Sequence, residues 1–545
     1  MSEKIYPWSP LFIEFLSRIE KRICLGEWGI DEYKGLYNCR TGKVACSIPV
    51  LPYRLKINAD DDDKEYVELI YIKYHKICTY TTERKMIASG KRLEELASHG
   101  IEVSEENEKL LCQAFNEIIT RSQPHMPSQA PVMPVVRTRD RLGWDGEEFI
   151  PYSQKVEYNK TENFSRLAEH FHEKGSFKDW IEYTRRLRKN KVFRIMLAAS
   201  FAGPLVDVIG QNSFITHLWG KTGKGKTVTL MAAMSVWGNP DTGALVLSLN
   251  NTENALGKIA GFLHNVPVAA DELQTIKNPA EGYDELIMQI TEGKERERMN
   301  YNYIIKPGTW RTSFLFTGEE PCVDTTSGGG AKNRVIQINS TEDIIANGNE
   351  TANFYRANYG FAGRRFIEKL DWQKAKDTYK SVFDSIMDYC DTTEKQAGSA
   401  ALLLTADWLS SEIFWELDEN GEVNRDEEVL QVDDIRPYLM SDKEVDIAGN
   451  AFSAVCDLIS AHNRNFTADA PERWGTIEDD RVYFNIRVLS REMKAMNLDY
   501  NAVKADWVER GYMLKGKDGK YRTNKSIAGL TTSCALLLLN TEPQV

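Results

Sequence analysis

The sequence predicts a multidomain α/β protein, and three observations lead to this fold class. The chain has 545 residues, which is enough for about three or four domains of roughly 100 to 200 residues each. Segments with the patterns of strands and helices alternate between residues 140 and 345, as in a parallel sheet covered by helices. A glycine-rich loop at 220–227 lies between one such strand and one such helix, a position typical of phosphate-binding α/β domains.

The composition excludes several classes of protein. Hydrophobic residues make up 42% of the chain and charged residues 27%, close to ordinary globular usage, which excludes collagen-like and largely disordered proteins. The 68 Lys and Arg residues against 80 Asp and Glu residues give a net charge of −12, so any nucleic-acid surface must be local. The nine cysteines are scattered and form no CxxC pair, which favours reduced, structural cysteines over disulfides or a zinc site.

The sequence carries no recognisable targeting or membrane-spanning signal. Its first residues lack a basic region followed by an apolar stretch, so we expect no secretory signal. We find no apolar run close to the roughly 20 residues needed to cross a bilayer, the longest being short stretches near Leu402 and Ala535. We therefore expect a cytoplasmic protein with no membrane partner.

The loop at 220–227 fits the phosphate-binding pattern GxxxxGK[ST], preceded by an apolar strand and followed by a helix. Glycines let backbone amides curl around phosphates, Lys226 would reach the β and γ phosphates, and Thr227 would offer a hydroxyl to Mg²⁺. A Gly/Lys-rich surface turn is the structural alternative. The sequence thus predicts binding of ATP and Mg²⁺ by Gly220, Thr222, Gly223, Lys224, Gly225, Lys226 and Thr227.

Two carboxylates follow the apolar run 265–270, about forty residues after the loop. Asp271 would hold Mg²⁺ through water, and Glu272 would act as the general base that polarises an attacking water. This pair favours an ATP hydrolase over a kinase, which must exclude water. The alternative is an acidic pair that simply ends a strand.

Two further residues complete the predicted catalytic set. Thr317 follows the apolar strand 310–316 and is placed to sense the γ phosphate, although a polar residue there can also cap a turn. Arg334 stands between a glycine-rich loop and the next strand. It is the candidate arginine finger, a residue that stabilises charge on the transferring phosphoryl group, with an ordinary surface arginine as the alternative.

Two segments carry candidate DNA contacts. The segment 293–306 is predicted to form a hairpin around an Asn-Tyr-Asn tip, with cations and aromatic rings suited to a single strand, although alternating glutamates dilute its charge and a solvated hairpin would look similar. Two short helices at 486–496 and 501–510, followed by a predicted basic hairpin around Asp518 and Gly519, have the order of a winged helix, which could instead contact protein. The candidate DNA-binding residues are Lys294, Arg296, Arg298, Tyr301, Lys306, Lys517 and Lys520, with Tyr303 as a further stacking face.

These features predict five segments along the chain. Four prolines within 122–134 prevent regular structure and indicate a linker after a mixed α+β domain. The segments are an N-terminal α+β domain at 1–130, a linker and entry to the ATPase at 131–190, an ATPase core at 191–345, a helical lid and connection at 346–465 and a winged-helix domain at 466–545.

With these motifs in place, the chain resembles the MCM-like AAA+ replicative helicases of bacterial mobile genetic elements, the replication proteins of cassette chromosomes and pathogenicity islands. The resemblance rests on residues 140–145, the loop 220–227, Asp271 with Glu272, the segment 293–296 leading to 310–312, residues 317–319, and the winged helix. It implies an AAA+ P-loop ATPase core, a hexameric ring with ATP between subunits, and Arg334 acting on a neighbour's nucleotide.

The resemblance also implies roles in DNA handling. Residues 293–306 would be a hairpin in the central channel, the protein would move along single-stranded DNA, by analogy 3′ to 5′, and the N-terminal domain would serve as a collar or bind DNA. A second sensor cation could be Lys395, Arg364 or Arg365. Expected partners are single-stranded and forked DNA, further copies of the chain, and replication partners such as a primase or a single-strand-binding protein.

Three hypotheses about function follow. The leading one is an ATP-dependent DNA helicase that replicates a mobile genetic element. The second is a nucleotide-switched origin-binding AAA+ protein that assembles on DNA without processive unwinding. A phosphotransferase is the third, and Glu272 disfavours it because this residue would activate water.

Overall fold

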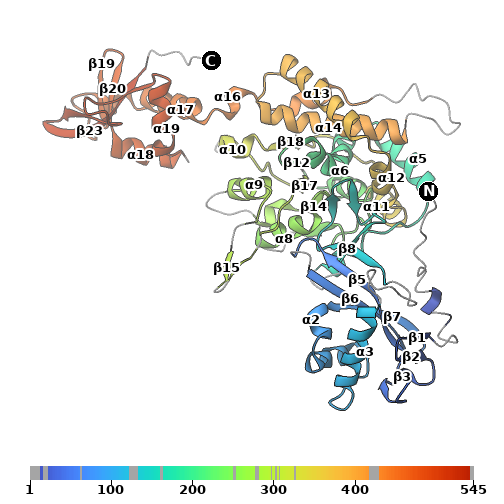
Figure 1. Ribbon diagram of the computed structural model, residues 1–545. Helices are drawn as coiled ribbons and strands as arrows, with labels where there is room; N and C mark the ends of the chain where they lie inside the picture. Colours follow the sequence, from blue (N-terminus) through green and yellow to red (C-terminus); the bar gives the residue numbers. More distant parts are fainter. Residues whose placement is uncertain are drawn as a thin grey trace. The chain divides into compact units, whose positions relative to one another are not determined.

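The computed structural model describes residues 13–15, 17, 23–61, 64–121, 133–159, 164–248, 253–276, 282–295, 298–300, 303–305, 307–324, 327–415, 429–496 and 498–539 (Figure 1). The chain divides into two compact units, Met1–Ser165 and Arg166–Val545. Most of the proline-rich segment predicted to be a linker, residues 122–132, lies outside the described residues.

The first unit contains two main sheets. A small antiparallel sheet consists of β1 (Ile23–Leu25), β2 (Trp28–Asp31), β3 (Gly35–Asn38) and β4 (Val44–Cys46). A five-stranded sheet has the order β11-β8-β5-β6-β7, formed by β5 (Val50–Asn58), β6 (Lys64–Lys73), β7 (Lys76–Glu83), β8 (Val135–Arg139) and β11 (Val156–Tyr158). Strands β5 to β7 pair antiparallel, whereas β8 runs parallel to β5 and β11 parallel to β8. A hairpin of β9 (Gly143–Asp145) and β10 (Glu148–Ile150) completes the unit's strands.

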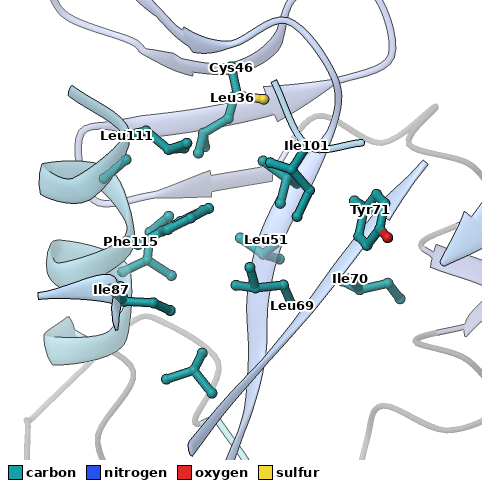
Figure 2. Packing of buried hydrophobic residues seen from close by; sticks show 14 of the residues in the cluster. Leu36, Cys46, Leu51, Leu69, Ile70, Tyr71, Ile87, Ile101, Leu111 and Phe115 are labelled. Carbon is teal, nitrogen blue, oxygen red and sulfur yellow. The ribbon is translucent and has the colours of Figure 1, made fainter. Parts of the chain in front are cut away.

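Helices cover one face of the larger sheet in the first unit. They are α2 (Arg84–Ile87), the 3-10 helix η1 (Gly90–His99) and α3 (Glu108–Arg121). Apolar residues of α3 recur at helical spacing, so Leu111 and Phe115 point together into the core with Leu51 and Leu69 of the sheet (Figure 2). This continuous core makes residues 23–121 an α+β body.

The acidic loop after β5 has a structural role that its sequence did not indicate. Asp60 accepts a hydrogen bond from Arg139 Nη1 at 2.6 Å, and Arg141 Nε lies 3.3 Å from the same carboxylate oxygen. Arg139 also pairs with Asp145. The segment 139–145 is therefore tied to the loop by a network of ion pairs that are mostly shielded from solvent.

The second unit is built on a five-stranded parallel sheet with the order β13-β14-β17-β12-β18. Its strands are β12 (Phe214–Trp219), β13 (Val246–Ser248), β14 (Val268–Asp271), β17 (Ser313–Gly318) and β18 (Val335–Asn339). Strand β17 is buried along its whole length, because helices cover both faces of a parallel sheet. The helices of this core are α4 (Ser165–Ala168), α5 (Phe177–Leu187), α6 (Lys191–Ile209), α7 (Lys226–Met234), α8 (Glu253–Leu263), η2 (Leu273–Ile276), α9 (Asp284–Thr291) and α10 (Gly329–Lys332).

Helix α6 corrects the expectation that no apolar run approaches membrane-spanning length. It has 19 residues with a mean hydropathy of 1.7, and it is the one helix among the described residues that is long and apolar enough to cross a bilayer. However, 83% of that apolar stretch is buried inside the protein, where α6 packs against α7, α14 and β17. Helix α6 is therefore a core helix that is apolar on all sides because neighbours surround it.

A helical region follows the sheet. It consists of α11 (Gly348–Ala357), α12 (Phe361–Lys369), α13 (Trp372–Tyr389), α14 (Glu394–Phe414), α15 (Val432–Ile435), η3 (Arg436–Tyr438) and α16 (Asp442–Val445). Helix α14 begins at an N-cap, Thr393, whose hydroxyl accepts a hydrogen bond from the Gln396 amide. Inside this region Asp407 accepts hydrogen bonds from Arg194 Nε at 2.7 Å and from the Leu430 amide at 2.8 Å, and Arg188 Nη1 lies 3.3 Å away.

The C-terminal region has its own core and the helix-helix-hairpin order predicted for it. Its elements are α17 (Ile447–Ala461), η4 (Asn463–Phe466), β19 (Gly475–Glu478), β20 (Arg481–Asn485), α18 (Ile486–Ala495), α19 (Tyr500–Glu509), β21 (Met513–Leu514), β22 (Thr523–Ile527) and β23 (Leu530–Leu538). Buried Trp474, Leu489 and Trp507 hold helices and strands together.

The position of the C-terminal hairpin turn differs from the prediction. The turn joins β22 and β23 at Ala528 and Gly529, both with positive φ, at 51° and 80°. Positive φ at both central residues matches the twist of a two-residue hairpin, which explains why the strands turn there. Asp518 and Gly519 instead lie in a basic loop between β21 and β22, and these two strands both pair with β23 rather than with each other.

Candidate active site

The glycine-rich loop connects β12 to α7 at the carboxyl edge of the parallel sheet. Gly223 and Gly225 have φ values of 86° and 87°, a conformation that glycine adopts without steric cost. Gly225 is the N-cap of α7, and Lys226 is the first residue of the helix. Unpaired amide groups at the start of a helix attract anions, so the loop places a helix end suited to an anion beside the ends of the central strands.

A pocket of about 350 Å³ opens at this edge. Its walls come from the loop, from the ends of β14 and β17, and from the segment 343–349 that precedes and begins α11. In parallel sheets, ligands bind outside the carboxyl ends of the strands, where several connections meet. The predicted residues Thr222, Gly223, Gly225, Lys226, Thr227, Asp271 and Glu272 all line this pocket.

Lys226 is turned back onto its own loop. Its ammonium group donates to the carbonyl oxygens of Gly220 at 2.7 Å and Lys221 at 2.8 Å. Burial lowers the pKa of Lys226, and the nearby carboxylates of Glu319 and Asp271 oppose this shift. The cation is thus held at the pocket wall by weak neutral acceptors, which a phosphate could replace.

Asp271, Glu272 and Thr317 meet at the ends of two neighbouring strands. The Thr317 hydroxyl donates to Asp271 Oδ1, which also accepts from the Glu272 amide at 3.1 Å. Glu272 is exposed and adopts a left-handed conformation with φ of 59°, held by the Thr275 amide and hydroxyl that both donate to its carbonyl oxygen at 3.0 Å. Backbone strain of this kind concentrates at functional sites, where the surrounding structure maintains it.

The structure brings further residues to the pocket that the sequence did not single out. Glu319 accepts a hydrogen bond from Thr222 at 2.6 Å, and Asp343 pairs with Lys224 at 2.9 Å. Gln274 and Asn349 also line the pocket. The sequence could have indicated Glu319, because this residue closely follows Thr317 after a buried apolar strand. Asp343 lies in an irregular segment after β18, where no local motif marks it.

Arg334 lies away from the pocket of its own chain. It directly precedes β18, in which Val335 pairs with Ile215 and Asn339 pairs with Trp219 at the loop. At about 3.3 Å per residue, Arg334 is therefore roughly 16 Å back along the strand from the pocket edge. Its guanidinium group donates to the Gly330 carbonyl at 2.7 Å.

The three candidates for a second sensor lie on the helices after the sheet. Arg365 stacks on Phe177 at 4.2 Å from the ring centre, and Arg364 pairs with Glu368 within the same helix. Lys395 lies in the first turn of α14. None of the three is among the described residues that line the pocket, so the choice between them stays open.

The two candidate DNA elements are described to different extents. Strands β15 (Arg298–Asn300) and β16 (Tyr303–Ile305) pair antiparallel, as expected for the hairpin. Lys294 is exposed at its base, whereas Arg296, Tyr301 and Lys306 lie outside the described residues, as does the side chain of Arg298. In the C-terminal region, Lys517 and Lys520 are exposed in the loop between β21 and β22.

The rest of the C-terminal surface has an uneven charge. Helix α18 exposes Arg487, Arg491 and Lys494 opposite its buried residues, whereas α19 exposes Asp506 and Glu509. Tyr521 in the basic loop lies beneath two ammonium groups, with Lys515 Nζ at 5.1 Å and Lys504 Nζ at 5.8 Å from its ring centre. The cationic surface therefore includes the loop together with Arg487 and Lys494 of α18, whereas Arg491 pairs with Glu472 and Glu492.

Comparison with known proteins adds three findings. Residues 39–310 match a sequence family described as a domain of unknown function, DUF927, and residues 446–542 match the family described as the Cch helix turn helix domain. Among solved structures, the fold is similar to that of a protein titled "SCCmec type IV Cch - active helicase", with a TM-score of 0.69 and 17% identity over 95% of this chain and 98% of that chain. No curated protein matches the sequence. The chain thus shares its multidomain fold with that protein and ends in a helix-turn-helix domain.

Proposed function

We propose that this protein is an ATP-driven DNA helicase that replicates a mobile genetic element. The observation that carries the proposal is the convergence of Lys226, Thr227, Asp271 and Glu272 on one pocket, with the buried Thr317 bonded to Asp271 behind it. The shared fold with a protein titled an active helicase and the match to a Cch helix turn helix domain support DNA as the substrate.

The order of the parallel strands supports an AAA+ P-loop core. The loop follows β12, and β17, whose last residue but one is Thr317, lies between β12 and β14, which ends in Asp271. The sensor and the acidic pair therefore stand beside the loop although they are far apart in sequence. An edge strand, β18, follows Arg334 and separates it from the pocket of the same chain.

The residues around the pocket fit Mg²⁺ and ATP. The start of α7 and the Lys226 ammonium supply positive charge for phosphates, while Thr227 and Asp271 supply the oxygen ligands that Mg²⁺ prefers. A volume of about 350 Å³ lies within the usual range for small-molecule sites. When bound, Mg²⁺ would neutralise charge that develops on the phosphates.

The chain's own residues then account for hydrolysis. Lys226 would exchange the Gly220 and Lys221 carbonyls for phosphate oxygens, and Glu272 would accept a proton from the attacking water at the pocket mouth. Thr317, already bonded to Asp271, would sense the γ phosphate and convey its loss to the acidic pair. Arg334 would act on a neighbouring subunit's nucleotide, since it is roughly 16 Å along the sheet from its own pocket.

In this proposal the active form is a hexameric ring. The β15–β16 hairpin and the basic C-terminal surface would contact DNA backbone phosphates, and movement on the single strand would run 3′ to 5′. Expected partners are a primase and a single-strand-binding protein.

Unwinding of forked DNA with either a 3′ or a 5′ single-stranded tail tests the proposal, with the Glu272→Gln variant as control. We expect ATP-dependent unwinding of the 3′-tailed fork alone, and its loss in the variant.

A helix-turn-helix domain also suits a nucleotide-switched origin-binding protein. ATP hydrolysis with an origin-specific footprint and no unwinding would support that second function instead.

A further inference from the structure

Two polar side chains behind the pocket have buried atoms that lack hydrogen-bond partners among the described residues. They are His217 in β12, with neither ring nitrogen bonded, and Gln274 in η2, whose Oε1 accepts no bond. His217 is fully buried, with 0% exposure. Buried polar atoms in folded proteins are nearly always paired, with protein or with ordered water, so each unpaired one requires a physical explanation.

Two of these atoms, His217 Nε2 and Gln274 Oε1, face the same position, the side of Gly318 where a side chain would begin. The nearest atoms to an ideal Cβ there are His217 Nε2 at 3.0 Å, Gln274 Oε1 at 3.3 Å and the Glu320 carbonyl oxygen at 3.6 Å. All three are polar. Because residue 318 is glycine, the space between them is not filled by a side chain.

The chemistry of the imidazole suits a hydrogen-bond donor at this position. Burial lowers the pKa of His217 to about 3, with Glu320 opposing the shift, so the ring is neutral at physiological pH. A neutral ring carries one N–H donor and one acceptor nitrogen. With Nε2 protonated, it can donate toward an oxygen, and both Gln274 Oε1 and the Glu320 carbonyl are acceptors.

Gln274 connects this position to the candidate general base. It stands in η2, two residues after Glu272, and it lines the nucleotide pocket. The turn of η2 begins at the strained Glu272, whose carbonyl oxygen accepts from Thr275. A tie between Gln274 and the central strand β12 would therefore restrain the short segment that orients Glu272.

We propose that His217 and Gln274 are positioning residues, joined by one buried water beside Gly318, that hold η2 and set the orientation of Glu272. A water at this site would have two or three polar partners, the number that buried waters usually have. The inference rests on the proposed ATPase function, because it assigns a role in orienting the general base of that reaction.

Steady-state ATP hydrolysis by the full chain with saturating DNA tests the proposal. For His217→Leu and Gln274→Leu we expect kcat to fall about 10-fold while KM for ATP stays within about twofold, since the ground-state phosphate contacts are intact. His217→Gln, which keeps a donor, should recover most of the lost kcat. Gly318→Ala, which places a methyl group 3.0 Å from His217 Nε2, should lower kcat like the Leu variants.

The double variant His217→Leu with Gln274→Leu distinguishes a shared pathway from two separate packing defects. We expect it to lose no more kcat than the worse single variant, because both changes break one connection. Thermal melting confirms that each variant is folded, and the half-buried Gln274 provides a variant that does not alter the sheet core.

Two results would overturn the inference while the proposed function stands. One is a kcat within twofold of wild type in folded Leu variants, and the other is a double variant whose losses multiply. A wild-type chain that fails to hydrolyse ATP with any DNA would instead overturn the proposed function, and this inference with it.

Discussion

Two groups of charges in the second unit, one in the helical region and one in the candidate active site, are held in opposite ways. Asp407 is 0% exposed, and its oxygens are bonded to Arg194, to the Leu430 amide and within 3.3 Å of Arg188, which also stacks on Trp415. In the pocket, Lys226 donates its hydrogen bonds within the described residues to backbone carbonyls, and Glu272 is exposed. A buried charge whose hydrogen bonds and ion pairs are made by protein groups holds helices together, whereas a charge that faces a cavity is available to a ligand.

The largest effect should come from the pocket. Lys226→Ala should abolish ATP hydrolysis, and Glu272→Gln should bind ATP while slowing hydrolysis about 10²- to 10⁴-fold, the usual contribution of a general base. Neither change should lower the thermal unfolding midpoint by more than a few degrees, because neither residue completes a buried network. Hydrolysis assays, nucleotide binding and melting curves on the same preparations check this, and normal turnover in either variant would contradict the site.

Arg334 should give the next largest effect, and it tests whether the pocket is complete within one chain. Because it lies far from its own pocket, Arg334→Ala should lower the ATPase rate by roughly 10³-fold in assembled protein, as for other arginine fingers. Mixing inactive Arg334→Ala with inactive Lys226→Ala should restore some activity, since some interfaces then combine an intact arginine with an intact pocket.

The mixture is informative only when both variants are present in the same assemblies. Differently tagged subunits, purified together through both tags, establish this. No recovery of hydrolysis in such mixed assemblies would argue against action between subunits.

Substitution in the buried network around Asp407 should show the reverse pattern, a large loss of stability. Asp407→Ala leaves two buried arginines without their carboxylate and should lower the free energy of unfolding by about 3 to 5 kcal/mol. Lys191→Ala is a matched control, because its ion pair with Asp434 is partly solvent-exposed and should contribute less than about 1 kcal/mol. Denaturant titration of the second unit's transition measures both, and equal losses would contradict the comparison.

The basic C-terminal loop should have a smaller, salt-dependent effect. If Lys517 and Lys520 each contact a phosphate, their double substitution by Ala should reduce the slope of log K against log salt by about 2 for duplex DNA. Lys525→Ala is the control, since its ammonium pairs with Glu478 at 2.5 Å and lies over Tyr483, a much closer pair than that of Lys520 with Asp518 at 3.6 Å. Binding titrations at several salt concentrations give the slopes, and an unchanged slope would exclude these two contacts.

The smallest effect concerns pH, and it extends the comparison to the first unit. Burial raises the pKa of Asp60, but the nearby guanidinium groups of Arg139 and Arg141 lower it by more, so the net pKa is lowered. Burial also raises the pKa of Glu68, and there Lys56 and Arg54 lower it by more. Carboxylates with lowered pKa stabilise the fold above their ordinary values of 3.8 and 4.5, and this contribution is lost as the pH falls below them.

The unfolding midpoint of the first unit should therefore hold constant between pH 7 and about 5 and fall below about pH 4. Arg139→Gln should make this acid dependence shallower, because it removes one cause of the lowered pKa of Asp60. Melting curves at stepwise pH values test this, and an identical acid profile in the variant would contradict the role of the ion pair.

Sequence patterns located the residues whose positions depend on local geometry. The loop at 220–227 needs glycine at positive φ and lies between a strand and a helix, and both requirements are visible in neighbouring residues. Asp271 ends a buried apolar strand and Thr317 is the last residue but one of another, so parallel pairing alone was enough to expect them at one edge. The Asp-Gly pair at 518–519 was misleading, because the hairpin turn depends on which strands pair with β23.

The sequence by itself determined the fold class, the position of the glycine-rich loop and that of the acidic pair, because each depends on residues within a few positions of one another. Only the tertiary structure decided that Asp343 reaches the pocket, that Arg334 lies at the opposite end of the strands, and that His217 and Gln274 face one position beside Gly318. These placements follow from strand order and register, which bring distant segments together through packing that no local pattern records.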